Sequence, residues 1–226
     1  MKLRYAVFYR EFQNKKFPFG LDIDQFDHLA DHLVIVDKRI NKIVGTYRLI
    51  SSAYSNTFYS QSEFENTEFI RSPGLKLELS RACIQKNYRT GAVMNLLWRG
   101  IAQYLQDTGS MYLFGCASIR TMDMHETACV YRHLQELGAI SNEYNVHPVG
   151  EYVMDGFPEY VETLPYNDQV KEIAKGLIPP LFQSYLRMGA HGYGLPALDR
   201  DFRCVDFFTV LRVENLKGLY EKKYMS

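Results

Sequence analysis

The residues best suited to carry chemistry begin with the run E-L-S-R, which contains Glu78, Ser80 and Arg81. A carboxylate on a strand can act as a general base, because desolvation raises the pKa of a buried carboxyl group. Glu78 could equally form a structural ion pair with Arg81 or Arg48, and Ser80 could simply satisfy backbone groups. Strand alternation puts Arg81 on the face opposite Glu78 unless a bulge re-aims it.

A polar turn, Q-K-N-Y-R-T-G, follows this run and leads into apolar residues at helical spacing. A strand that enters a helix through a glycine-containing turn leaves unpaired N–H groups at the helix start, and such groups bind phosphate. Taken alone, such a turn is a weak signal. The candidate phosphate-binding residues are Arg89, Thr90, Gly91 and Ala92.

A third group of charged residues lies upstream and consists of Arg48 with Asp24, Asp27 and Asp31. Arginine forks bind carboxylates in a bidentate manner, so Arg48 and Arg81 could hold the carboxylate of a substrate. The three aspartates could hold a distal ammonium group. They could equally form a solvated acidic loop or cap a helix.

The elements that must position these residues follow from hydrophobic periodicity. Residues 33–37 and 43–50 are β-branched runs around a polar turn and predict a hairpin, whereas residues 4–12 fit either a strand or the start of a helix. Three further strands and three helices are expected in a mixed α/β fold. The predicted strands span 75–84, 111–117 and 204–213, and the predicted helices span 92–106, about 126–137, and Pro180 to Gly189.

Composition sets the broad class. The chain has 226 residues with 26 basic and 26 acidic side chains, which predicts a single domain over residues 1–226 and argues against a nucleic-acid partner. The four cysteines are widely spaced without C-x-x-C, so no metal site is expected. The sequence offers no signal peptide and no run of 18 apolar residues, which favours a cytoplasmic location.

The segment E-L-S-R-A-C-I-x-x-x-Y-R-x-G-A-V-x-x-L-L-W-R-G-I at 78–101 resembles the GNAT-superfamily N-acyltransferases that make ornithine lipids and are often labelled hemolysin-like. The resemblance extends over nearly the whole chain. Its other segments are R-Y-A-V-F-Y-R-E at 4–11, F-D-H-L-A-D-H-L at 26–33, V-G-T-Y-R-L at 44–49, F-Y-S-Q-S-E-F at 58–64, L-F-G-C-A-S at 113–118 and P-P-L-F-Q-S-Y-L-R-M-G-A at 179–190. The pattern of Asp24, Asp27, G-T-Y-R-L and E-x-S-R is also similar, more distantly, to acyl-homoserine-lactone synthases.

The resemblance implies a GNAT-like fold and transfer of a long, 3-hydroxylated acyl chain from an acyl carrier protein thioester to the α-amine of ornithine. No tightly bound cofactor is implied, because acyl-phosphopantetheine, carried by the carrier protein or by CoA, is a co-substrate. Arg89-Thr90-Gly91-Ala92 is shorter than the usual phosphate loop and has one glycine, which fits a carrier-protein donor. Where many relatives have a tyrosine in the following helix, this sequence has Leu134, and Tyr131 is not assigned that role.

Three functions stay open on the sequence. The first is lyso-ornithine lipid synthesis, and the second is synthesis of another N-acyl amino acid or of a signal related to acyl-homoserine lactones. The third is a non-catalytic fatty-acyl-binding or hemolysin-like protein. The carboxyl-terminal L-K-G-L-Y-E-K-K-Y could contact the inner membrane surface peripherally, although a solvated chain end explains it equally well.

Overall fold

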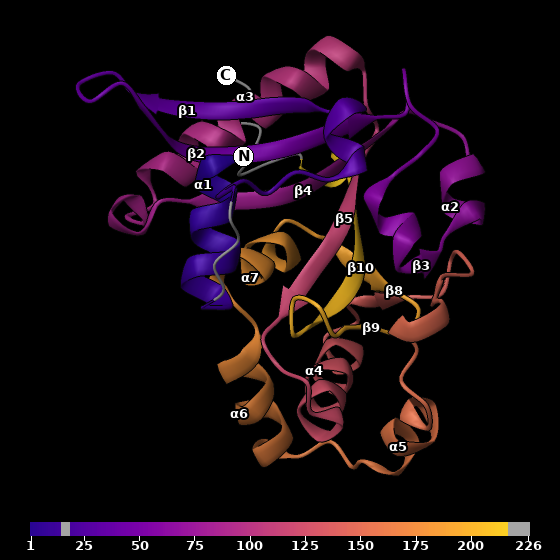
Figure 1. The fold of residues 1–226 in the computed structure, drawn as a ribbon. Coiled ribbons are helices and arrows are strands. Elements are labelled where there is room, and N and C mark those ends of the chain that lie inside the picture. Colours follow the sequence, from indigo (N-terminus) through magenta and orange to yellow (C-terminus); the bar gives the residue numbers. More distant parts are fainter. Residues whose placement is uncertain (15–18, 217–226) are drawn as a thin grey trace. The chain divides into compact units, whose positions relative to one another are not determined.

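A computed structural model describes residues 1–14 and 19–216, which form two compact units (Figure 1). Unit 1 comprises Met1–Phe58 and Leu75–Met111, and unit 2 comprises Tyr59–Gly74 and Tyr112–Leu216.

Unit 1 is built on three antiparallel strands in the order β1-β2-β4. The β-branched runs of β1 and β2 pair around a polar turn, as the sequence predicts. The amino-terminal segment is helical and includes a π-helical stretch. The elements of unit 1 are α1 (Lys2–Tyr5), η1 (Ala6–Phe12), η2 (Gln25–His28), β1 (Asp31–Asp37), β2 (Lys42–Ser51), β4 (Lys76–Ile84), η4 (Lys86–Tyr88) and α3 (Ala92–Thr108).

Helix α3 packs closely against β1 and β2, and two glycines make this approach possible. A methyl group added to Gly45 on β2 would lie 2.5 Å from Val93 Cγ1 of the helix. A methyl group on Gly100 of the helix would lie 2.6 Å from Leu33 Cδ1 of β1. Because these two glycines have no side chain, the helix can pack directly against the sheet, and it also contacts β4.

Unit 2 contains a second set of strands in the order β5-β10-β8-β6, with β9 also paired to β10. Its pairs are antiparallel except for the parallel pair of β6 and β8, so the fold is mixed α/β as predicted. A small separate pair joins β3 and β7. The strands are β3 (Phe64–Glu65), β5 (Tyr112–Ile119), β6 (Ile140–Ser141), β7 (His147–Pro148), β8 (His191–Tyr193), β9 (Ala197–Asp199) and β10 (Cys204–Arg212).

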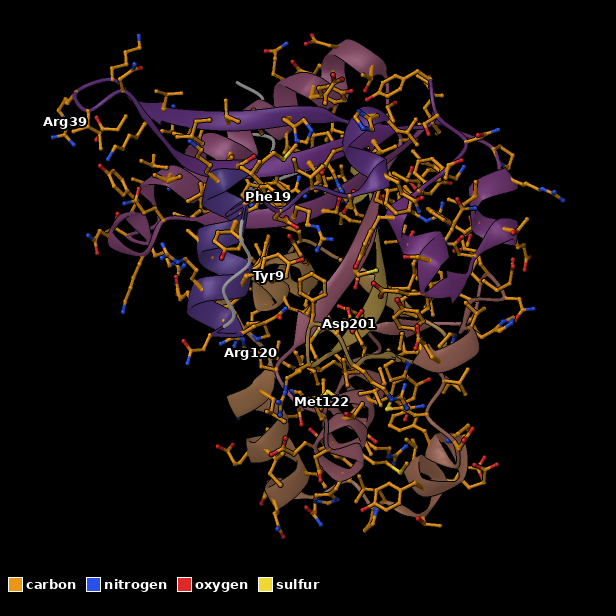
Figure 2. The ribbon with its side chains drawn as sticks, in the orientation of Figure 1. Tyr9, Phe19, Arg39, Arg120, Met122 and Asp201 are labelled. Carbon is orange, nitrogen blue, oxygen red and sulfur yellow. The ribbon has the colours of Figure 1, made fainter. Side chains whose placement is uncertain are left out.

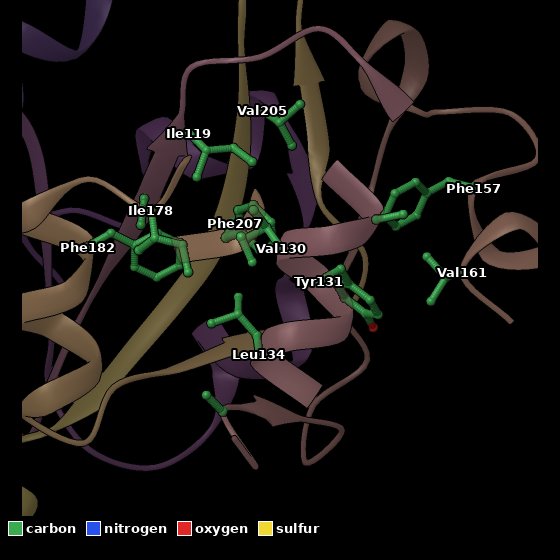
Figure 3. Packing of buried hydrophobic residues seen from close by; sticks show 14 of the residues in the cluster. Ile119, Val130, Tyr131, Leu134, Phe157, Val161, Ile178, Phe182, Val205 and Phe207 are labelled. Carbon is green, nitrogen blue, oxygen red and sulfur yellow. The ribbon is translucent and has the colours of Figure 1, made fainter. Parts of the chain in front are cut away.

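Four helices cover one face of β5 and β10. Val205 and Phe207 of β10 pack with Val130 and Leu134 of α4 and with Phe182 of α7 (Figure 3). The alternate residues of β10 point to the other face, where Phe208 contacts Phe64 and Phe69. The helical elements of unit 2 are η3 (Tyr59–Ser62), α2 (Thr67–Arg71), α4 (Met124–Glu136), η5 (Gly150–Tyr152), α5 (Phe157–Thr163), α6 (Asp168–Leu177), α7 (Pro180–Arg187) and η6 (Val213–Leu216).

Each strand and helix that was assigned by periodicity is confirmed to within a few residues. The structure adds the helices α2, α5 and α6 and the strands β3, β6, β7, β8 and β9. All of these except α6 are too short to stand out by periodicity, whereas α6 carries Val170, Ile173, Ala174 and Leu177 at helical spacing, a signal that was available in the sequence. Within residues 1–14 and 19–216, none of the helices combines the length and the apolar character needed to cross a bilayer.

The close approach of α3 to β2 predicts that Gly45→Ala destabilises the protein by about 1–3 kcal/mol, because the stiff Val93 side chain blocks the added methyl group. Urea denaturation measures the change. Gly176→Ala in α6 is the control, since nothing lies within 4 Å of its added methyl group. This control should be neutral or stabilising by up to about 1 kcal/mol. Equal effects of the two substitutions would contradict the packing argument.

Candidate active site

A β-bulge in β4 brings Arg81 into the candidate site. Thr46 of β2 faces Cys83, whereas Arg48 faces Ser80, so the register shifts between these two pairs. Arg81 lies in the shifted stretch with a φ of 51°, a left-handed conformation that is uncommon for residues other than glycine. The bulge re-aims the side chain, and Arg81 joins Ser80 in contacting one network of charged residues.

Arg48 connects β4 to the acidic segment at residues 22–27. Its Nε donates a hydrogen bond to Ser80 Oγ at 2.9 Å, and its Nη1 lies 2.6 Å from Asp24 Oδ1 and 3.4 Å from Asp27 Oδ1. The Nη2 of Arg81 reaches the other oxygen of Asp24 at 3.0 Å. Arg48 and Arg81 therefore share Asp24, and Ser80 orients the Arg48 guanidinium.

Two residues that were not predicted complete the network. Arg4 of α1 donates from Nε to Asp22 Oδ2 at 2.6 Å and from Nη1 to Asp27 Oδ1 at 2.5 Å. Arg4 lies in R-Y-A-V-F-Y-R-E, one of the segments that carries the family resemblance, and Asp22 alternates with Asp24 in L-D-I-D. Those two signals could have pointed to both residues. The complete set, called the Arg–Asp network below, is Arg4, Asp22, Asp24, Asp27, Arg48 and Arg81.

A helix start holds the aspartates in place. Asp24 is the N-cap of η2 and accepts a hydrogen bond from the Phe26 amide, while Asp27 accepts one from the Asp24 amide at 2.9 Å. This reciprocal capping satisfies backbone donors and fixes both carboxylates toward the arginines. The alternative interpretation of these residues as a helix cap is thus correct for Asp24 and Asp27, alongside their ion pairs.

Burial divides the Arg–Asp network into an inner and an outer part. The side chains of Arg4, Asp22, Asp27 and Arg48 are each at most 3% exposed. Arg81 is 11% exposed and Asp24 is 23% exposed. A ligand can therefore reach Arg81 and Asp24 more readily than the four inner residues, which position the outer pair.

The charges of the network stabilise its ionised aspartates. Burial alone would raise the pKa of Asp24, but hydrogen bonds and charge from Arg48 and Arg81 outweigh it and lower the pKa to about 2. Burial likewise opposes ionisation of Asp27, and the hydrogen bonds from Arg4 reverse this and lower its pKa. Both carboxylates are therefore ionised at neutral pH.

Asp31 lies apart from the other two predicted aspartates. Its Oδ2 accepts hydrogen bonds from Tyr54 at 3.1 Å and from Tyr104 at 2.7 Å. The structure thus brings together Asp24, Asp27 and Arg48 and places Asp31 with two tyrosines at the exposed surface.

Glu78 is fully buried and lies opposite Ile50 of β2, two residues before Ser80 on β4. Cys83, which follows E-L-S-R, is also buried, and desolvation raises the pKa of its thiol to about 12. The Cys83 thiol is thus protonated at neutral pH and unsuited to act as a nucleophile.

The predicted phosphate turn leads into α3. Gly91 is the N-cap of α3 with a φ of 91°, and no side chain among the described residues caps this end. The residues from Arg89 to Ala92 are exposed, and the first amides of the helix have no partner within its own hydrogen-bond pattern. Arg89 itself is engaged: its Nε donates to the Ile84 carbonyl at 2.9 Å and its Nη2 to Glu11 Oε2 at 2.8 Å.

The Arg–Asp network and E-L-S-R lie within a segment that matches a known domain family. Residues 3–99 match the model of the acetyltransferase (GNAT) domain. An L-ornithine N(alpha)-acyltransferase of Rhizobium meliloti is 32% identical over 239 residues, covering 98% of this chain and 78% of that protein. The chain belongs to this acyltransferase family.

The match to the family is spread along the chain. The L-ornithine N(alpha)-acyltransferase of Agrobacterium fabrum is 30% identical over 241 residues, covering 98% of this chain and 79% of the relative. Among solved structures, the CoA-dependent acyl-homoserine lactone synthase BjaI superposes with a TM-score of 0.52 at 16% identity, over 98% of this chain and 79% of that one. The predictions of a GNAT-like fold and of an N-acyltransferase enzyme are confirmed.

The lowered pKa of Asp24 predicts a pH-dependent contribution to stability. The folded-state pKa of about 2 lies below the usual 3.8, so the stabilisation is fully present above pH 3.8 and is lost as the pH falls through 2. We expect Asp24→Asn, which can still cap η2, to cost about 1–2 kcal/mol at pH 7, because Asp24 is partly exposed, and about half as much at pH 3.

Urea denaturation at the two pH values measures this effect. The matched control is Asp155→Asn, an exposed aspartate in unit 2, for which we expect less than about 0.5 kcal/mol at either pH. A cost of Asp24→Asn that stays the same at pH 3 and pH 7 would show that the carboxylate charge is not its source.

Proposed function

We propose that the protein transfers a long fatty acyl chain, 3-hydroxylated in the preferred donor, from an acyl-phosphopantetheine thioester to the α-amine of ornithine. The neutral amine attacks the thioester carbonyl carbon, the carbon–sulfur bond breaks, and an amide and a free pantetheine thiol form. The amine loses one proton and the leaving thiolate takes up one. The family relationship over 98% of the chain is the observation that carries this proposal.

In this proposal the outer part of the Arg–Asp network contacts the acceptor. Arg81 would bind the acceptor carboxylate, and Asp24 would face its side-chain ammonium group, because these two are the most exposed members. Arg48 and Asp27 are positioning residues, since they hold Asp24 and are almost fully buried. Asp31 is hydrogen-bonded to Tyr54 and Tyr104 instead of to the Arg–Asp network, so any contact that it makes with the acceptor would be separate from that network.

Glu78 is the proposed base, either directly or through a water molecule. It is fully buried and lies on the same strand as Ser80 and Arg81, and a positioned carboxylate is one of the common general bases. Ser80 supports the reaction by orienting Arg48 at 2.9 Å.

The proposed donor site is the start of α3, where the amides that follow Gly91 would bind the phosphopantetheine phosphate. Arg89 is held by Glu11 and Ile84, so its proposed contribution is to fix this turn and to add positive charge beside it. Lys86 and Arg99 are exposed on either side of the turn. They would attract an acidic acyl carrier protein, which we propose as the donor in preference to CoA.

An acceptor screen tests the function. The purified protein is mixed with 3-hydroxyacyl carrier protein and a pool of amino acids, and N-acyl products are identified by mass spectrometry. We expect N-acyl-ornithine as the main product. Glu78→Gln should lower kcat by about 10²–10⁴-fold, because proton transfer by a placed group contributes that much.

Two results would contradict the proposal. One is release of thiol without an N-acyl product, which would make the protein a thioesterase. The other is a main product built on another acceptor, which would favour a signal synthase. Glu159→Gln, at an exposed glutamate of α5, is the control and should keep full activity, and full activity of Glu78→Gln would refute the base assignment.

A peripheral membrane contact is the remaining part of the proposal. The predicted carboxyl-terminal contact lies at residues 216–224, which beyond Leu216 fall outside the described residues. The β1–β2 hairpin offers a second contact surface, with Arg39 at its tip (Figure 2). The four exposed apolar side chains of this hairpin patch are Val34, Val36, Ile40 and Ile43, and its exposed lysines are Lys38 and Lys42.

Exposed aliphatic side chains beside lysines favour binding to an anionic bilayer, because burial of apolar area and attraction to lipid phosphates act together. We expect the protein to sediment with phosphatidylglycerol vesicles and Val36→Glu/Ile40→Glu to reduce the bound fraction by at least about fivefold. Leu137→Glu, at an exposed leucine of unit 2, is the control and should bind as the wild type does. Equal binding of all three proteins would exclude the hairpin patch.

A further inference from the structure

A second cluster of charged residues lies in unit 2, on the face of β10 away from the four helices. Asp199 of β9 pairs in register with Cys204 of β10, and Asp206 lies two residues further along the same face. Asp206 pairs in register with Ser118 of β5, whose hydroxyl donates a hydrogen bond to Asp206 Oδ1 at 2.5 Å. The hairpin and the strand pairing thus gather one thiol and two carboxyl groups at one place.

The donor atoms of these residues are close enough to share one ion. One oxygen or sulfur from each of Asp199, Cys204 and Asp206 lies within 4.8 Å of the others, and all three residues are buried. Cys204 Sγ lies 3.6 Å from Asp206 Oδ2. Donors that surround a zinc ion at about 2.0–2.3 Å in a tetrahedron lie about 3.3–3.8 Å apart, and the spacing of Cys204 and Asp206 falls within this range.

A third buried carboxyl group, that of Glu63 between η3 and β3, neighbours Asp206. Glu63 is 0% exposed, and neither of its carboxylate oxygens has a hydrogen-bond partner of standard geometry among the described residues. The Glu63 and Asp206 carboxyl groups are close neighbours: burial chiefly raises the pKa of Glu63, and the Asp206 charge adds to that rise. Tyr59 and Cys116 also approach this carboxyl and oppose the rise. A fully buried carboxyl group that makes no hydrogen bond of standard geometry and lies beside two other acids is suited to bind a cation.

The charge balance of this cluster differs from that of the Arg–Asp network. There, each aspartate faces an arginine at 3.0 Å or less. Here, the side chains acting most strongly on Glu63 and Asp206 are acids, a hydroxyl or thiols, with no basic side chain among them. Buried carboxylates without a cation are costly, so protons or a bound cation must balance them.

We propose that Glu63, Asp199, Cys204 and Asp206 bind one divalent transition-metal ion of the zinc class. Four donors satisfy the tetrahedral preference of Zn²⁺, and the thiolate selects zinc over Mg²⁺ or Ca²⁺, which bind oxygen ligands. Ser118, which donates a hydrogen bond to Asp206, is exposed, so the cluster lies one residue from the surface. This proposal departs from the expectation, drawn from cysteine spacing, that the chain holds no metal, because the site has a single cysteine: three donors come from the β9–β10 hairpin and Glu63 comes from a distant segment.

Cobalt substitution tests the site independently of enzyme activity. Purified full-length protein is stripped with a chelator, dialysed and titrated with Co²⁺, and the thiolate-to-cobalt charge-transfer absorption is recorded. We expect the band to saturate at one Co²⁺ per chain and to be displaced by one equivalent of Zn²⁺. Cys204→Ser should abolish the band, and Asp206→Asn should weaken metal binding by at least about tenfold.

The controls separate this site from other thiols and from misfolding. Cys129→Ser removes a buried cysteine outside the cluster and should leave the band unchanged. Glu63→Gln, which keeps the size of the side chain, should fold with a wild-type circular dichroism spectrum and bind Co²⁺ at least about tenfold more weakly. Absence of the band in the wild type, or its persistence in Cys204→Ser, would overturn the proposal. In the first case the acids are balanced by protons alone.

Discussion

The ion pair between Arg48 and Asp24 is the contact on which the candidate active site depends. Arg48 is completely buried, and a buried guanidinium is tolerated only when its charge and its hydrogen-bond donors are matched. Asp24 supplies the charge and Ser80 accepts the hydrogen bond from Nε. Through these two contacts, one side chain of β2 ties the capped segment at residues 24–28 to the strand that carries Glu78, Ser80 and Arg81.

The remaining members of the network extend this constraint. Arg4 of α1 donates hydrogen bonds to Asp22 and Asp27, so the acidic segment is paired with arginines from the amino-terminal helix as well as from the sheet. Removing one partner of a buried ion pair costs about 3–5 kcal/mol, because the other charge is left unpaired. Such a network is rigid, and rigidity suits an acyltransferase that must hold an amine at a fixed position before a thioester. The partly exposed pair of Arg81 and Asp24 is the part of the network proposed to contact the acceptor.

The two buried charge clusters of the protein illustrate two solutions to one physical problem. In unit 1, arginines neutralise aspartates, and the pKa of Asp24 falls to about 2 despite burial. In unit 2, burial dominates, and it raises the pKa of Asp206 to about 6, with the Asp199 charge adding to the rise. The same residue type is therefore held ionised by arginines in one place, whereas in the other burial disfavours its ionised form.

The sequence by itself determined the mixed α/β class, the hairpin, the strand 75–84 and the helix after the phosphate turn, because apolar residues repeat there at the period of each element. It also identified Glu78, Ser80, Arg81, Arg48, Asp24 and Asp27 as candidate residues, although their roles remain proposals. Only the tertiary structure showed that Arg4 and Asp22 complete the network, that a bulge re-aims Arg81, that Asp31 lies apart, and that Glu63 faces Asp206. Periodicity reports which face of one element is buried, whereas these contacts depend on strand register and on segments distant along the chain, which no local pattern encodes.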